Sequence, residues 1–468
     1  MTDVRALLRR TADLAADFLE SLENRPVFPE TSVEELRASL GGPLPDDPND
    51  PETVVEGLAA AADAGLVGTA SGRYFGFVIG GALPASLAAD WLTSAWDQNA
   101  GLYVGGPSAS VVEQVVREWV CDLLGLPADA SIGFVTSTQM GSVTALAAAR
   151  YRVLERAGWD VGRDGLAGAP RVRVLVGAKR HITIDRALRL LGLGAPEPVA
   201  ADSQGRMEAA ALRDAIRTVD GPTIICAQAG EVNTGAFDPF EDIADAAAEH
   251  GAWLHVDGAF GLFARLSPRT AHLADGVELA DSVISDGHKW LNVPFDCGFA
   301  FIRDDAYLRA VFSAGAAYLP EVQDERPMYA FLGPELSRRA RSLAVWATLR
   351  AYGRTGYRAI VERCLDNAAH LAGLVEDAED LELLLPAPLN VVYFRYRPPG
   401  VPAEELDELN RRIAEEVLTD GRVYVGTTQW AGAVGFRPAF VNWRTTRADA
   451  ELVLETVRDL GSQLVAQV

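Results

Sequence analysis

Short apolar segments alternate with alanine-rich helical segments between residues 85 and 350, and this alternation limits the folds open to the chain. Near-continuous apolar strands separated by helices are typical of parallel sheets that are covered on both faces. The sequence therefore predicts an α/β fold with a mostly parallel central sheet and helices on both faces. The clearest strands are expected at residues 172–176, 223–227, 253–257 and 298–302.

Three parts are expected along the chain, because the pattern changes on either side of this central region. Apolar residues recur at helical spacing over residues 3–22, and a linker rich in Pro, Gly and Asp follows at 41–48. Towards the C-terminus, strand-like segments at 390–396 and 423–425 alternate with helical ones. The predicted parts are an N-terminal helical arm (1–84), a large domain (85–350) and a small α+β C-terminal domain (351–468).

The N-terminal arm has little hydrophobic core of its own, so it needs another surface to cover its apolar face. A second copy of the chain is the simplest candidate, since most oligomers are closed two-fold dimers. The segment 101–107 could then reach a neighbouring site. We therefore expect a homodimer with its active site near the interface.

Composition restricts the partners and the compartment. The formal net charge of −23 argues against binding to nucleic acid or to an anionic membrane. Four cysteines without CxxC spacing indicate neither a metal site nor a disulfide framework. Acidic residues at helical spacing near the N-terminus do not resemble a targeting peptide, and no apolar run reaches bilayer length. We expect a cytoplasmic protein.

Lysine is almost absent from the chain. Its 42 basic residues comprise only two lysines, Lys179 and Lys289, and 40 arginines. Arginine stays protonated and cannot form an imine, whereas a desolvated lysine amine can attack a carbonyl group. Lys289 is thus a candidate to hold a carbonyl cofactor such as pyridoxal 5′-phosphate. The alternative is that it is an ordinary surface cation.

Asp257 ends one of the predicted strands, and ligands of parallel sheets bind beyond the carboxyl ends of strands. A buried carboxylate needs a cationic or hydrogen-bonding partner. A protonated pyridine nitrogen would supply the cation and would remain charged beside the carboxylate. The alternative is an aspartate that only caps a turn.

Two further segments could contribute to the same edge of the sheet. Residues 134–142 run from a strand through a small polar loop into a helix, an arrangement that can bind phosphate through backbone N–H groups, although such residues also cap ordinary helices. His181 follows a strand and precedes a helix, and His288 adjoins Lys289. Each imidazole could stack on a ring or carry a proton, or could be structural.

With these residues in view, the chain resembles the group II pyridoxal-phosphate-dependent amino-acid decarboxylases, the family of the aromatic amino-acid, histidine and glutamate decarboxylases. The resemblance extends from Tyr74 to Thr446. Its most specific parts are the segment 254–259 (LHVDGA) and, about thirty residues later, the segment 286–290 (DGHKW). It implies the aspartate aminotransferase fold type I, in which residues 85–350 bind the cofactor.

The resemblance also implies roles for individual residues. Lys289 matches the Schiff-base lysine, and Asp257 the partner of the pyridine nitrogen. His181 matches the histidine that stacks on the cofactor ring, and Tyr329, in a segment similar to the family's mobile catalytic loop, the tyrosine that protonates the substrate carbon. The remaining candidates for cofactor binding are Thr138, Gln139 and Met140 at the phosphate, together with Asp286, His288, Ala259 and Asn233.

The implied activity is conversion of an L-amino acid to its amine and CO2, with an aromatic or apolar substrate. Tyr74, Phe75, Phe77 and Tyr103, with Trp91, are candidates for an apolar pocket, or are core residues. Gly80–Gly81 replaces bulkier or polar residues of the aromatic-specific enzymes, Met140 replaces a small residue, and Asp286 places a negative charge near a phosphate. The alternatives are an aldolase or other lyase, an aldehyde-forming oxidative decarboxylase, less readily a transaminase, and a catalytically silent regulatory relative.

Overall fold

The computed structural model describes residues 3–315 and 326–466, and the chain forms two compact units. The larger unit comprises residues 82–366 and 385–391. The other unit comprises residues 1–81, 367–384 and 392–468, and so contains both the N-terminal segment and most of the C-terminal segment. The predicted three-part division, with boundaries after residues 84 and 350, stays a prediction.

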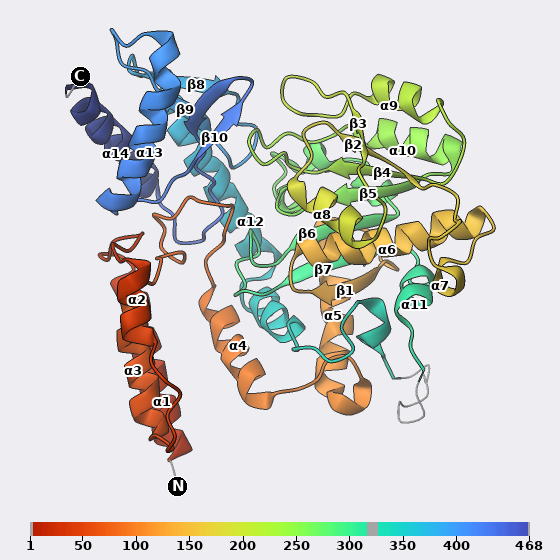
Figure 1. Ribbon diagram of the computed structural model, residues 1–468, viewed down its shortest axis with the longest axis horizontal. Coiled ribbons are helices and arrows are strands. Elements are labelled where there is room, and N and C mark those ends of the chain that lie inside the picture. The colour runs from red at the N-terminus through yellow and green to blue at the C-terminus, as the bar shows by residue number, and fades with distance from the viewer. Residues whose placement is uncertain (1–2, 316–325, 467–468) are drawn as a thin grey trace. The chain divides into compact units, whose positions relative to one another are not determined.

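A seven-stranded sheet in the order β1-β7-β6-β5-β4-β2-β3 forms the centre of the larger unit (Figure 1). Its pairings are parallel, except that β7 runs antiparallel to both β1 and β6. Every residue of the strands other than β3 is buried, which requires cover on both faces. The predicted α/β class with a mostly parallel sheet is therefore confirmed. The strands are β1 Ser131–Val135, β2 Arg173–Gly177, β3 Glu197–Val199, β4 Thr223–Gln228, β5 Trp253–Asp257, β6 Ser282–Asp286 and β7 Gly298–Ile302.

Helix α6 contributes most to one side of this sheet. Its alanine-rich surface packs on strand residues such as Ile284 and Ala300 and on helices α8 and α11. Gly141 allows the close approach, since a Cβ there would lie 3.1 Å from Ile284 Cγ2. The helices of this unit are α4 Pro84–Trp96, α5 Pro107–Leu124, α6 Thr138–Arg156, α7 Val161–Asp164, α8 Ile182–Leu190, α9 Ala209–Ile216, α10 Phe240–His250, α11 Ala306–Phe312 and the first part of α12 Ser342–Glu376.

The other unit combines a four-stranded sheet, ordered β10-β11-β9-β8, with helices α13 and α14. Of the two strands predicted here, 390–396 corresponds to β9. The prediction of a strand at 423–425 is wrong, because Tyr424 forms only an isolated bridge, with Tyr74, and the next strand begins at Thr427. The elements are β8 Leu381–Leu385, β9 Tyr393–Tyr396, β10 Thr427–Trp430, β11 Ala433–Phe436, α13 Leu406–Asp420 and α14 Arg447–Ala466.

The N-terminal segment forms three helices, and the first, α1 Val4–Ser21, is the predicted amphipathic helix. The next two are α2 Val33–Leu40, which begins with a Ser32–Glu35 capping box, and α3 Pro51–Asp63, which is capped by Asp50. None of the three helices contains a buried residue. No helix in the described part of the chain has both the length and the apolar character needed to cross a membrane.

Candidate active site

The carboxyl ends of three strands meet at one edge of the central sheet. β5 ends at Asp257, and the neighbouring parallel strand β6 ends at Asp286. β1 joins this edge because Gly298 of β7 pairs both with Val135 of β1 and with Asp286. A Cβ on Gly298 would lie 2.6 Å from the carbonyl carbon of Ser137, so the loop between β1 and α6 crosses here over a residue without a side chain.

Asp286 connects this loop to Lys289. Its Oδ1 accepts a hydrogen bond from the backbone N–H of Thr138 at 2.7 Å, and its Oδ2 accepts one from the Thr138 hydroxyl at 2.8 Å. The same Oδ2 lies 3.1 Å from Lys289 Nζ. Burial leaves only 2% of the Asp286 side chain exposed. The negative charge that the sequence places near a phosphate is therefore hydrogen-bonded and paired with a cation.

His288 lies on the other side of this carboxylate, with Nε2 3.6 Å from Asp286 Oδ1. Its ring stacks on Phe295 at a centroid distance of 4.2 Å, and its Nδ1 accepts the N–H of Cys297 at 3.4 Å. Burial lowers the pKa of His288, although the charge of Asp286 acts in the opposite direction. The neutral imidazole is the favoured form, so the positive charge beside Asp286 belongs to Lys289.

Asp257 is buried, with 7% of its surface exposed. Among the described residues, its side chain accepts a hydrogen bond only from the N–H of Ala259, at 3.1 Å. Burial raises the pKa of Asp257, and the charges of His181 and Lys289 oppose this without outweighing it. A protonated ring nitrogen is the kind of partner that such a carboxylate lacks.

His181 is exposed at the start of α8, where it is the N-cap residue. Its Nδ1 lies 2.8 Å from the hydroxyl of Thr183. The carbonyl of Thr183 accepts a bond of 3.3 Å from Gln139 Nε2, which links the first turns of α6 and α8. The electrostatic effect of His181 on Asp257 places the imidazole near that carboxylate.

The first turn of α6 offers donors for an anion. Within the part of the chain that the structure describes, the backbone N–H groups of Gln139 and Met140 have no acceptor. They begin a 19-residue helix, whose dipole favours negative charge at this end. These donors suit the phosphate of pyridoxal phosphate, the amine of Lys289 suits its aldehyde, and the carboxylate of Asp257 suits its ring nitrogen.

Tyr329 is not part of this group within its own chain. It is half-buried at the start of a short 3₁₀ helix, Tyr329–Leu332, and lines a pocket of about 600 Å³ with Ser131 and Arg303. These two residues mark the opposite edge of the sheet, about 13 Å away along a five-residue strand. Burial, more than the charge of nearby Glu113, raises the pKa of Tyr329 to about 12. Its catalytic role stays a prediction.

The candidates for a substrate pocket have different environments. Phe75 is buried edge to face with Phe440, and Tyr74 is buried and stacked on Tyr424 at 4.7 Å. Phe77 is 66% exposed and has a positive φ of 52°, an uncommon conformation for a side chain of this size. In the larger unit, Tyr103 is half-buried and Trp91 is 42% exposed. Their assignment to a pocket stays a prediction.

Asn233 lies in the turn that follows β4, where its backbone N–H and side chain donate to the buried carboxylate of Glu231 at 2.6 and 3.0 Å. Sequence reasoning did not identify Glu231, nor Phe295 as the stacking partner of His288. A buried acid two residues before Asn233 and an aromatic residue seven after His288 give no distinctive signal, because both contacts depend on how the loops return to the sheet.

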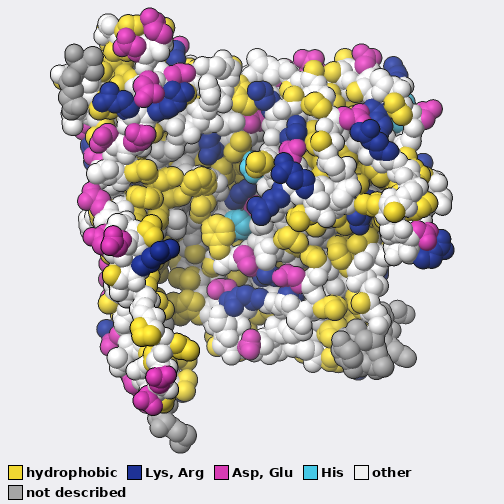
Figure 2. Space-filling view, in the orientation of Figure 1, with side chains coloured by type: hydrophobic (Ala, Val, Ile, Leu, Met, Phe, Trp, Pro, Cys, Tyr) yellow, Lys and Arg dark blue, Asp and Glu magenta, His cyan; other side chains and the backbone are white. Residues whose placement is uncertain are grey.

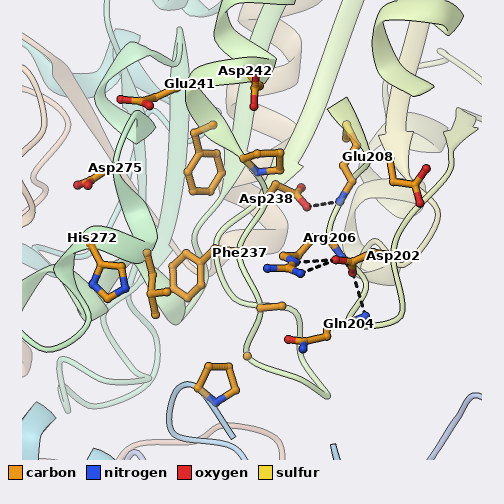
Figure 3. Close-up of a pocket in the computed structure, with 17 residues that line it drawn as sticks. Asp202, Gln204, Arg206, Glu208, Phe237, Asp238, Glu241, Asp242, His272 and Asp275 are labelled. Carbon is orange, nitrogen blue, oxygen red and sulfur yellow. Dashed lines mark hydrogen bonds and ion pairs between the residues drawn. The ribbon is translucent and has the colours of Figure 1, made fainter. Parts of the chain in front are cut away.

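A second pocket of about 580 Å³ lies beside α10, lined by residues that include Asp202, Arg206 and Asp238 (Figure 3). Arg206 is paired with Asp202. Asp238 accepts the backbone N–H groups of Met207 and Gln228, and burial raises its pKa to about 6. None of the predicted site residues lines this pocket. Asp202, Arg206 and Asp238 thus already have partners within the fold.

Comparison with known proteins relates the whole chain to one family. Residues 34–397 match the pyridoxal-dependent decarboxylase conserved domain. The chain is 27% identical to an aromatic-L-amino-acid decarboxylase of Bacillus atrophaeus, over 99% of this chain and 96% of that protein. It is 32% identical to an L-2,4-diaminobutyrate decarboxylase of Rhizobium meliloti (strain 1021), over 82% and 76% respectively.

A solved structure supports the same relationship. The crystal structure of Oryza sativa TDC with PLP and tryptamine superposes with a TM-score of 0.91 at 26% identity, covering 99% of this chain and 98% of that one. The predicted fold type I is therefore confirmed.

Proposed function

We propose that this chain, which belongs to the pyridoxal-dependent decarboxylase family and is a pyridoxal 5′-phosphate-dependent amino-acid decarboxylase, converts an aromatic or apolar L-amino acid to its amine. Lys289, Asp257 and the first turn of α6 lie together at one edge of the sheet, and this observation supports the roles assigned to them. Only 19% of the Lys289 side chain is exposed, and its amine is ion-paired to a buried carboxylate that also bonds to the start of α6, which is not the environment of a surface cation.

Each residue has a distinct task in this proposal. Lys289 holds the cofactor through its amine, and Asp257 stabilises positive charge on the ring nitrogen. The N–H groups of Gln139 and Met140 bind the phosphate, and His181 contacts the ring. When bound, the cofactor supplies an electron sink for the pair of electrons that CO2 leaves behind on the substrate carbon.

Two relatives favour an aromatic substrate. The Bacillus protein is named for aromatic amino acids, and the rice structure contains tryptamine. The exposed ring of Phe77, held out by a left-handed backbone, is available for an aromatic contact in its unit. The diaminobutyrate-specific relative represents the competing class, a substrate with a cationic side chain.

The proposal includes a homodimer. Helices α1–α3 bury none of their residues, and hydrophobic side chains are visible along their surface at the lower left of Figure 2. Val4, Leu8 and Leu58 are each about three-fifths exposed, at 62%, 59% and 60%. An apolar face of this kind is stabilised by a second protein surface.

A cytoplasmic location is supported by the four buried free cysteines, which are typical of a reducing compartment.

The scarcity of lysine makes the test unambiguous. Protein loaded with pyridoxal phosphate is treated with borohydride, and the cofactor is located by peptide mass spectrometry. We expect it on Lys289 in the wild-type protein and in Lys179→Met, and not in Lys289→Met. The same three proteins are incubated with a pool of L-amino acids, and a product that equals one amino acid minus CO2 identifies the substrate.

Other results would reject parts of the proposal. Attachment at Lys179 would refute the assigned site. An aldehyde with consumption of O2, instead of an amine, would show that the product was assigned wrongly. Decarboxylation of 2,4-diaminobutyrate alone, with the aromatic amino acids left intact, would overturn the proposed substrate class.

A further inference from the structure

We infer that Asp286 is a positioning residue that docks the ammonium group of Lys289 against the first turn of α6 whenever that amine is not bonded to the cofactor. This inference rests on the proposed function and deepens it. The resemblance drawn from the sequence implies only that Asp286 lies near the phosphate. The structure gives it a different task, which follows from what its two oxygens contact.

Both oxygens of Asp286 are occupied by groups of the protein. Oδ1 accepts the Thr138 N–H, and Oδ2 accepts the Thr138 hydroxyl and lies 3.1 Å from Lys289 Nζ. An ionised carboxylate has no hydrogen to donate, so it cannot bind a phosphate oxygen. Asp286 also takes the N–H of Thr138, and this leaves those of Gln139 and Met140 for an anion.

The charge of Asp286 is tolerable here only because Lys289 balances it. A carboxylate with 2% of its side chain exposed needs a cation or its charge is costly. Within the described residues, the cationic groups within 4 Å are Lys289 and His288, and the favoured form of His288 is neutral. The opposite charges of Asp286 and Lys289 therefore cancel, and a phosphate bound at α6 contacts the positive end of the helix without a net negative charge beside it.

The pair also fixes a distance before any ligand arrives. Thr138 starts the helix that is to bind the phosphate, and Lys289 is to bond to the aldehyde at the other end of the same small molecule. Asp286 contacts both, so the two attachment points are held relative to each other by one buried side chain. Such preorganisation lowers the cost of binding.

A double-mutant cycle on the apo protein tests this pairing. The probe is pyridoxine 5′-phosphate, which has the ring and phosphate of the cofactor but no aldehyde, so Lys289 keeps its amine. We expect Lys289→Met to weaken probe binding at least ~10-fold, because it leaves an unbalanced charge beside the phosphate. Asp286→Asn should change binding by no more than ~3-fold, and the double variant should return to within ~3-fold of wild type.

Thermal unfolding of the same apo proteins provides a second readout that needs no cofactor. We expect Lys289→Met to lower the Tm and the added Asp286→Asn to restore it, because a buried carboxylate without its cation is destabilising. Asp281→Asn is the matched control. Asp281 accepts one backbone N–H, from Leu254 at 2.8 Å, at the opposite edge of the sheet, and Asp281→Asn should change the Tm by the same amount in the wild type and in Lys289→Met.

The outcomes separate this inference from the proposed function. Additive effects of the two substitutions in both readouts would overturn the docking role. A wild-type protein that binds neither pyridoxal phosphate nor the probe, but retains the coupling in thermal unfolding, would reject the proposed cofactor site and keep the Asp286–Lys289 pair.

Discussion

Replacing Asp257 with Asn should have opposite effects on the apo protein and on cofactor binding. Asn keeps an oxygen for the Ala259 N–H, which lies 3.1 Å from Asp257 Oδ1, and removes a buried charge. The apo protein should therefore gain stability. The cofactor loses the partner of its ring nitrogen, and removing one member of a buried charged pair costs roughly 2–5 kcal/mol, or about 30-fold to several-thousand-fold in affinity.

The stability gain has a defined pH dependence. Because burial raises the pKa of Asp257, the folded protein keeps a proton that the unfolded chain loses as the pH rises past about 3.9. The unfolding free energy of the wild type therefore falls relative to the variant as the pH rises from about 4 to the raised pKa. Each pH unit of that interval contributes about 1.4 kcal/mol, and the difference is constant above it.

Urea unfolding of the apo proteins at pH 4, 6 and 8 and titration with pyridoxal phosphate at pH 8 measure the two effects. Asp281→Asn is again the control, since burial also raises the pKa of Asp281, at the far edge of the sheet. It should share the stability gain and leave cofactor affinity unchanged. A variant Asp257→Asn that binds the cofactor within ~3-fold of wild type would show that Asp257 does not pair with the ring nitrogen.

Further predictions concern Tyr329, His255 and Gly298. If Tyr329 serves the site of a partner subunit, mixing inactive Lys289→Met with Tyr329→Phe should restore about a quarter of wild-type activity, whereas action within one chain would restore none. Burial lowers the pKa of His255 to about 3, so the unfolded chain alone takes up a proton below about pH 6.5, and acidification from pH 6.5 to 5 should cost the wild type about 2 kcal/mol more than His255→Gln in urea unfolding. Gly298→Ala should lower both the Tm and cofactor affinity, because its Cβ would lie 2.6 Å from Ser137, while Gly373→Ala, with nothing within 4 Å, should lower neither.

The sequence predicts most of the central sheet because the information for it is local. Apolar runs of five residues correspond to β2, β4, β5 and β7 within a residue or two. The weaker segments β3 and β6 were not recognised. β3 has only three residues, of which only the last is buried. β6 is fully buried, but it ends in the polar residues Ser285 and Asp286, so its sequence does not show the apolar run expected of a buried strand.

Boundaries governed by side-chain capping or tertiary contact are harder to predict. α6 begins at Thr138, five residues earlier than the helix expected from 143, because Asp286 satisfies the N–H and hydroxyl of Thr138 and so allows Thr, Gln and Met to enter the first turn. Val423 and Val425 are buried as they would be in a strand, but the segment 423–425 pairs only through the isolated bridge between Tyr424 and Tyr74. The sequence pattern alone therefore predicts the wrong secondary structure there.

The contact that most affects the chemistry could not be read from the sequence, because Thr138 and Asp286 are 148 residues apart. They meet because β7 runs antiparallel between β1 and β6 and aligns the ends of both strands at Gly298. A parallel strand in that position would not connect back so directly from β6, since parallel neighbours need a long crossover. The single reversed strand thus brings the loop that binds phosphate next to the aspartate three residues before the lysine. In that setting an aspartate near a phosphate becomes a counter-ion for Lys289.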